Sequence, residues 1–273
     1  MGTDLRSEWR RDLSSDRLRP IVTIRIFFAA LALMTAAGTL SAQSTGQELP
    51  DYQRSYVELR DRTYNSENPD RLGFLYRRAL QQARGAHRQG TLDDVDLAYW
   101  VGQIEYMMGR AWQAVEENEQ ADEHYESGLE TVESALEERR TSELLRLQSD
   151  TISQLCLVRG LGYTILNGPR VGPLAQEALE LDPDNGKAII ILASAKVYPP
   201  PIFGGNPTEG IRLMREALEK PNIDKDDRFN ILSGIGVALG KLNRESEARR
   251  YLRRALDLYP ENEFATEELS RLQ

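Results

Sequence analysis

The chain has 273 residues, of which 40% are hydrophobic and 28% are charged, and its formal net charge is −9. These proportions are typical of a folded protein with one or two domains, or of one elongated array. The negative balance argues against binding to nucleic acid, because phosphate binding requires a concentrated basic surface. The single cysteine, Cys156, excludes an internal disulfide and a metal site built from several thiolates.

The N-terminal segment has the composition of a secretory signal. Six arginines lie within the first 25 residues, and an uncharged apolar run of 15 residues extends from Ile26 to Leu40. A bilayer core requires about 20 apolar residues. The basic start, the short apolar run and the small residues that follow it predict a signal peptide over residues 1–42, cleaved after Ala42 or, as an alternative, after Gly38.

The rival interpretation is an uncleaved inner-membrane anchor formed by residues 21–40. In both cases the rest of the chain faces an extracytoplasmic space, so the sequence predicts a periplasmic or secreted protein.

A small residue recurs in similar apolar contexts along the remainder of the chain. The five positions are Ala79, Gly128, Ala178, Ala217 and Ala255, spaced by 49, 50, 39 and 38 residues. Three positions before each of them stands an apolar or small residue: Tyr76, Tyr125, Ala175, Met214 and Leu252. A spacing of three places both residues on one helix face, where the small one lets another helix approach closely. Recurrence at tens of residues predicts an array of units that cover each other's apolar faces.

The first three units are the least regular. A helical pair within residues 43–90 is inferred only from its closing helix. In residues 95–139, Gly102 is the small residue expected where the first helix packs on the second. In residues 151–185, Gly160 is predicted to take that role.

The last two units are clearer. Residues 186–221 form one unit with an insertion, and residues 229–262 form the most regular one. In the latter, the two helical faces carry Leu232, Ile235, Gly236, Leu239, Ala248, Leu252 and Ala255, and Pro260 closes the second helix. These residue types and intervals resemble the tetratricopeptide repeat (TPR), whose units are helix pairs of about 34 residues.

The resemblance implies an all-α fold, namely a right-handed α-solenoid of about four to five TPR-like helix pairs, with the repeat array in residues 91–273. In agreement, no segment alternates with the period of two that a sheet requires.

The stretch "YPPPIFGGNPTEG" is interpreted as the turn between the two helices of the fourth unit. Its unusual residues are Pro199, Pro200, Pro201, Ile202, Phe203, Gly204, Gly205 and Asn206. The prolines favour an extended approach, the glycines permit a positive φ, and Asn206 followed by Pro207 can begin a helix. Ile202 and Phe203 are expected to fold back over the helix pair. A phosphate-binding loop is disfavoured because no Gly-Lys-Ser/Thr follows, and a short site for a proline-reading partner is the other alternative.

The inner face of such an array comes mainly from the first helix of each pair. By resemblance to the TPR family, that face binds peptide segments or partner proteins. Projecting the repeat gives the inward residues Tyr99, Gln103, Tyr106, Gln154, Leu157, Leu161, Lys187, Ile190, Ser194, Asn230, Ser233 and Val237. This set contains one cation, too few to grip a carboxylate, so a hydrophobic or neutral segment is the expected ligand.

No catalytic constellation is predicted. His87 and His124 lie in polar helical contexts without a nucleophile motif, and Cys156 lies in an apolar run that favours a buried thiol. We therefore expect a secreted or periplasmic scaffold that mediates protein–protein interaction, that is not an enzyme, and that uses no cofactor or metal. Self-association into a homo-oligomer is left open.

A second hypothesis assigns the chain to solute transport. The long first units and the insertion before "GGNP" are similar to the T-component of periplasmic TRAP transporter systems, whose helix pairs resemble TPRs. That resemblance implies an accessory protein that partners a substrate-binding receptor. The lipid-anchor cysteine often present in that family is absent from this sequence.

Cleavage of the signal peptide can be measured directly. We expect N-terminal sequencing of the protein recovered from the extracytoplasmic fraction to begin at Gln43, because the small residues before it suit a signal peptidase. A membrane-bound product that retains the apolar run would instead support the anchor.

Overall fold

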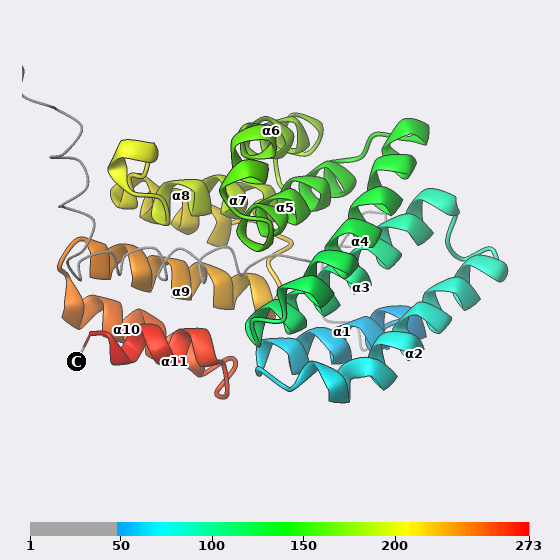
Figure 1. Cartoon of the computed structure of the whole chain (residues 1–273), viewed down its shortest axis with the longest axis horizontal. Helices are drawn as coiled ribbons and strands as arrows, with labels where there is room; N and C mark the ends of the chain where they lie inside the picture. The colour runs from blue at the N-terminus through cyan, green and yellow to red at the C-terminus, as the bar shows by residue number, and fades with distance from the viewer. Residues whose placement is uncertain (1–47, 273) are drawn as a thin grey trace, which may run out of the picture.

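Figure 1 shows the computed structural model of the chain, which describes residues 48–272. The predicted signal peptide and the alternative anchor lie outside these residues. The described residues form helices and turns, without strands, so the predicted all-α fold is confirmed. Within this part of the chain, no helix combines the length and the apolar composition needed to cross a bilayer.

The helices form five consecutive hairpins followed by one short helix. They are α1 (Asp51–Tyr64) with α2 (Pro69–Arg88), α3 (Asp94–Ala114) with α4 (Asn118–Glu138), α5 (Ser142–Val158) with α6 (Leu161–Leu181), α7 (Gly186–Val197) with α8 (Pro207–Leu218), α9 (Lys225–Lys241) with α10 (Glu245–Leu256), and α11 (Glu263–Ser270). Each hairpin packs on the next, and one continuous apolar core runs through all of them. The prediction of four to five stacked helix pairs is therefore confirmed.

Side chains that accept hydrogen bonds from the first turn determine where several helices begin. Asn185 Oδ1 accepts from the amide of Ala188 at 3.0 Å, and Asn262 Oδ1 accepts from the amide of Ala265 at 2.9 Å. These asparagines end the "DPDN" and "YPEN" turns, which the sequence predicts as breaks between helices.

The recurring small residues lie where the helices of each hairpin touch. Ala79, Gly128, Ala178, Ala217 and Ala255 are all buried, and each belongs to the second helix of its hairpin. A Cβ atom added at Gly102 of α3 would lie only 2.7 Å from Val132 of α4. Larger side chains at such positions would force the two helices apart.

The third hairpin begins earlier than the sequence predicts. Thr141 Oγ1 accepts from the amide of Leu144 at 3.2 Å, so α5 begins at Ser142 and not near residue 151. Gly160 is consequently not a packing residue: it precedes α6 with φ 75°, and no atom lies within 4 Å of the position of its missing Cβ. The apolar period of α5 is concealed because its buried face carries Arg146 and Asp150.

The proline-glycine stretch is the α7–α8 turn, as predicted. Asn206 Oδ1 accepts from the amide of Glu209 at 3.1 Å, and Gly204 has φ 86°. Gly205 is required for another reason, because a Cβ atom there would lie 1.9 Å from the carbonyl oxygen of Pro199.

The prediction that Ile202 and Phe203 fold back over the helix pair is wrong. These side chains are 83% and 74% exposed, since residues Pro201–Phe203 form a 3₁₀ turn that points them outward. The turn is held at its base, where Lys241 Nζ donates to the carbonyls of Val197 and Tyr198 at 2.8 and 2.5 Å.

The end of α1 lies beside the start of α9 and the α10–α11 turn (Figure 1). Tyr64, at the end of α1, packs edge-on against Phe229 of α9 and stacks on Tyr259 of the α10–α11 turn, with ring centroids 5.5 and 5.0 Å apart. Asn230 Nδ2 donates to the Tyr64 hydroxyl at 2.9 Å, and Asn262 Nδ2 donates to the Tyr64 carbonyl at 2.7 Å. The end of α1 therefore contacts the start of α9 and the α10–α11 turn.

Close packing inside the hairpins can be tested at Gly236. We expect Gly236→Ala to lower the free energy of unfolding by about 1–3 kcal/mol, because the new Cβ would lie 2.7 Å from Leu252 Cγ. Urea denaturation monitored by circular dichroism measures the change.

Gly172→Ala is the matched control for that substitution. Gly172 is also helical, but nothing lies within 4 Å of its missing Cβ, so the substitution should raise stability by about 0.5–1 kcal/mol. Equal effects of the two substitutions would contradict the packing account.

Candidate functional site

The residues predicted for the inner face lie mostly in the interior. Ten of them are buried on the first helices of their hairpins: Tyr99, Gln103, Tyr106, Gln154, Lys187, Ile190, Ser194, Asn230, Ser233 and Val237. Leu157 is half-buried, whereas Leu161 is 75% exposed because it begins α6 and does not belong to a first helix. Most of these positions are thus inaccessible to solvent, and partner binding by them stays a prediction.

A chain of hydrogen bonds crosses this interior from hairpin to hairpin. Tyr56 of α1 donates to Gln103 Oε1 of α3 at 3.4 Å, and Gln103 Nε2 donates to the Tyr99 hydroxyl at 3.0 Å. Arg146 of α5 donates to the Tyr99 hydroxyl at 3.4 Å and to Glu143 Oε2 at 2.7 Å. The first three hairpins are therefore connected by polar contacts as well as by the apolar core.

Several charged side chains of the interior are nearly inaccessible to solvent. Those exposed by no more than 8% are Arg60, Glu105, Glu143, Arg146, Asp150, Lys187, Asp226 and Asp227. Burial raises the pKa values of Asp150, Asp226 and Asp227 well above those of exposed carboxyl groups. Sequence reasoning missed all of these except Lys187, because charges at helical spacing ordinarily mark a solvated face.

Three carboxylates gather where α9 begins. One oxygen each of Asp224, Asp226 and Asp227 lie within 4.8 Å of one another, a separation that could suit a metal ion. Two side chains already supply positive charge there: Arg60 Nη1 lies 2.8 Å from Asp226 Oδ1, and Lys187 Nζ lies 3.6 Å from Asp224 Oδ2. These two cations offset part of the charge of the three carboxylates, and the cluster joins α1 and α7 to α9.

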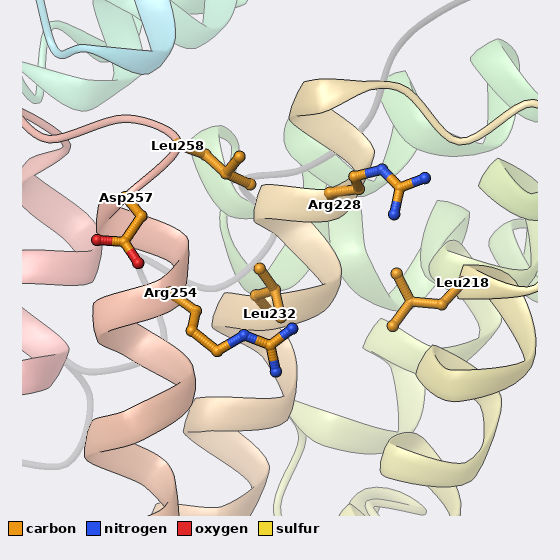
Figure 2. A pocket seen from close by; sticks show the side chains of 6 residues that line it. All are labelled: Leu218, Arg228, Leu232, Arg254, Asp257 and Leu258. Atoms are coloured by element: carbon orange, nitrogen blue, oxygen red, sulfur yellow. The ribbon is translucent and has the colours of Figure 1, made fainter.

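The described surface has an open groove of about 260 Å³ between the last two hairpins. Figure 2 shows its lining: Leu218 at the end of α8, Arg228 and Leu232 on α9, Arg254 on α10, and Asp257 and Leu258 just after α10. The side chains of Leu218, Arg228 and Arg254 surround the same space. Both arginines are exposed, and no ion pair is found for either among the described residues.

Many other exposed arginines among the described residues contact a carboxylate. Arg139, for example, donates to Asp93 at 2.9 Å, and Arg212 donates to Glu209 at 2.7 Å. A groove with an apolar floor and two available guanidinium groups can bind a chain segment that carries apolar side chains and a carboxylate.

No protein-family model matches the chain. No curated protein matches it. Among solved structures, it matches the crystal structure of YrrB, described as a TPR protein with an unusual peptide-binding site, at 16% sequence identity and a TM-score of 0.33. The match covers 79% of this chain and 96% of that chain.

A match at this identity and TM-score does not indicate what the chain binds. The fold is established by the packing of the hairpins themselves. The chain is a TPR-like array of helical hairpins. Small residues at the touching positions, asparagine caps after proline turns and stacked helix pairs confirm the predicted resemblance at the level of the fold.

The acid cluster predicts a specific dependence of stability on pH. Burial raises the pKa of Asp226 to about 6, although Arg60 and Lys187 favour its ionised form, against 3.8 for an exposed aspartate. The unfolded chain therefore loses this proton at lower pH than the folded protein does, and ionisation destabilises the fold as pH rises from about 4 to 6. Asp226→Asn, which cannot ionise, should gain up to about 3 kcal/mol relative to the wild type across that range and nothing more above it.

Urea denaturation of both proteins at several pH values measures this difference. The attraction of Arg60 already contributes to the pKa of Asp226, because only the ionised carboxylate pairs with the guanidinium. A difference between the two proteins that stays constant from pH 4 to 7 would contradict the assignment.

Proposed function

We propose that this protein is a non-catalytic scaffold of an extracytoplasmic compartment that binds a partner protein through an exposed segment of that partner. The observation that carries the proposal is the groove between the last two hairpins, where Arg228 and Arg254 flank the apolar side chains of Leu218 and Leu232.

The location of the groove supports this proposal. The inner-face positions of this array are mostly buried, so a partner meets the outer surface first. The groove combines apolar area with two arginines that form no ion pair among the described residues, although Arg254 lies over the Tyr251 ring at 5.3 Å. Apolar area and such cations both favour binding of a foreign segment. The segment proposed for the groove carries a carboxylate, whereas the segment expected for the inner face is hydrophobic or neutral. The inner-face set contains only one cation, Lys187, and that side chain faces Asp224 and Asp227.

The arrangement of the titratable groups supports a non-catalytic role. His124 Nδ1 lies 2.7 Å from Glu105 Oε2, and His87 Nδ1 lies 3.1 Å from the carbonyl oxygen of Leu92. His124 thus contacts α3, His87 contacts the α2–α3 turn and the start of α3, and neither histidine lines the groove. Burial raises the pKa of the Cys156 thiol, which disfavours the nucleophilic thiolate.

A co-purification experiment tests the proposal. The tagged protein is recovered from the extracytoplasmic fraction together with bound partners, and the same is done with Arg228→Glu/Arg254→Glu. We expect the double substitution to weaken partner binding at least tenfold, because it replaces two cations beside the bound carboxylate with like charges.

Arg253→Glu is the matched control, since Arg253 is exposed on the same helix but does not line the groove. Equal partner binding by the wild type and the double variant would show that the groove is not the binding site. Recovery of a solute-binding receptor as the partner would favour the T-component-like role, whereas recovery of envelope-assembly proteins would favour the general scaffold.

A further inference from the structure

The outer face of α2 carries a row of positive charge. Beyond Asp70 in its first turn, its exposed side chains recur at intervals of three and four positions, which places them along one side of the helix. They are Arg71, Phe74, Arg77, Gln81, Arg84 and Arg88. We call this set the α2 stripe. Because the sequence has no aspartate or glutamate between residues 71 and 92, the stripe contains four arginines and no acid.

The second helices of other hairpins meet solvent with a different charge pattern. The exposed glutamates of α4, the second helix of the next hairpin, are Glu119, Glu123, Glu130, Glu137 and Glu138. The helix α10 is also rich in arginine, but its own acids contact two of those arginines: Glu245 lies 3.6 Å from Arg249, and Glu247 lies 3.7 Å from Arg250. The α2 stripe is thus a basic face on a chain whose net charge is −9.

The four arginines of the α2 stripe form no ion pair among the described residues. Two acids near the helix contact side chains outside the stripe: Glu58 Oε2 lies 3.1 Å from Arg78 Nη1, and Asp94 Oδ1 lies 3.5 Å from His87 Nε2. Four guanidinium groups therefore extend over about 25 Å of helix without a carboxylate partner from this part of the chain. Such a row produces a local positive potential even on an acidic protein.

The composition of the α2 stripe favours an anionic lipid surface over a folded protein as its partner. A protein interface ordinarily has an apolar centre and a polar rim. Here the centre is Arg77, Gln81 and Arg84, and the one large apolar side chain, Phe74, lies towards one end and is 65% exposed. Guanidinium groups donate several hydrogen bonds to phosphate oxygens, and an aromatic ring beside them can enter the interface of a bilayer.

The position at which the chain enters the first hairpin also favours a lipid surface. Pro50 and Asp51, at the start of α1, line a small pocket together with Gln82 and Gly85 of α2. Ten residues separate Asp51 from Leu40, the end of the apolar run in the sequence, and they span at most about 35 Å. If that run acts as the membrane anchor, the α2 stripe therefore lies within reach of the lipid headgroups.

We propose that the α2 stripe binds the anionic headgroups of a phospholipid bilayer and holds the first hairpin against the membrane surface. The attraction acts between exposed charges, so it weakens as the salt concentration rises. The acidic faces of the molecule are repelled by the same surface, which orients α2 towards it. The groove of the proposed function lies on the last hairpins, so lipid binding by α2 does not depend on that groove.

Co-sedimentation of the purified chain with phospholipid vesicles tests this inference. We expect binding to vesicles that contain phosphatidylglycerol, and we expect Arg77→Gln/Arg84→Gln to weaken it at least about tenfold, because each arginine near an anionic bilayer adds to the attraction. Arg215→Gln/Arg253→Gln is the matched control, since both arginines are exposed and form no ion pair among the described residues, but lie on α8 and α10. This control removes the same charge and should leave binding unchanged.

The comparison isolates α2 because the wild type and both variants share every other segment, including the basic N-terminal residues. Glutamine is a good helix former, and circular dichroism of each variant verifies that it remains helical. Equal weakening by the two double substitutions, or equal binding to phosphatidylcholine and phosphatidylglycerol vesicles, would overturn the inference.

A fluorescence experiment identifies the face that meets the vesicle without removing any arginine. An environment-sensitive dye attached to Gln81→Cys, in the middle of the α2 stripe, should shift to shorter wavelength when phosphatidylglycerol vesicles are added. The same dye on Ser134→Cys, an exposed position of α4, should not shift, and the buried Cys156 competes little for the label. Equal shifts at both positions would contradict the assignment to α2. Absence of vesicle binding would overturn it as well, and binding of an acidic protein or a nucleic acid to the stripe would then identify another partner.

Discussion

The contact between Tyr64 and the last hairpin holds the two ends of this array together. Its ring lies between Phe229 and Tyr259, and both its hydroxyl and its carbonyl accept from asparagine amides. A repeat array normally exposes an unpaired face at each end and an open groove between them. Here the end of α1 contacts the last hairpin through side chains, and most of the inner-face residues named above are buried.

Burial removes water from the charged side chains of the inner helices. In an open array, Arg146 and Asp150 would be hydrated, whereas in this array they are 0% and 3% exposed. Removing such charges from water is costly, and the attraction between partners such as Arg60 and Asp226 offsets that cost only in part. The apolar core and the aromatic contacts are thus the main source of stability, while the ion pairs restrict which helices can face one another.

The outer surface is consequently where this protein can meet other molecules. The groove beside Arg228 and Arg254 offers two cations beside the apolar side chains of Leu218 and Leu232. The start of α6 exposes Leu161, Ile165 and Leu166.

The sequence by itself determined the helical pairs. Small residues such as Ala178 and Ala255, and the asparagines after proline turns, encode local packing and capping, which depend on residues a few positions apart. The sequence placed Gly160 and Leu161 wrongly because the polar buried face of α5 conceals its helical period. Only the tertiary structure decided that the ends meet, because that contact joins Tyr64 to residues about 165 to 200 positions away, and no local pattern records how far successive hairpins rotate.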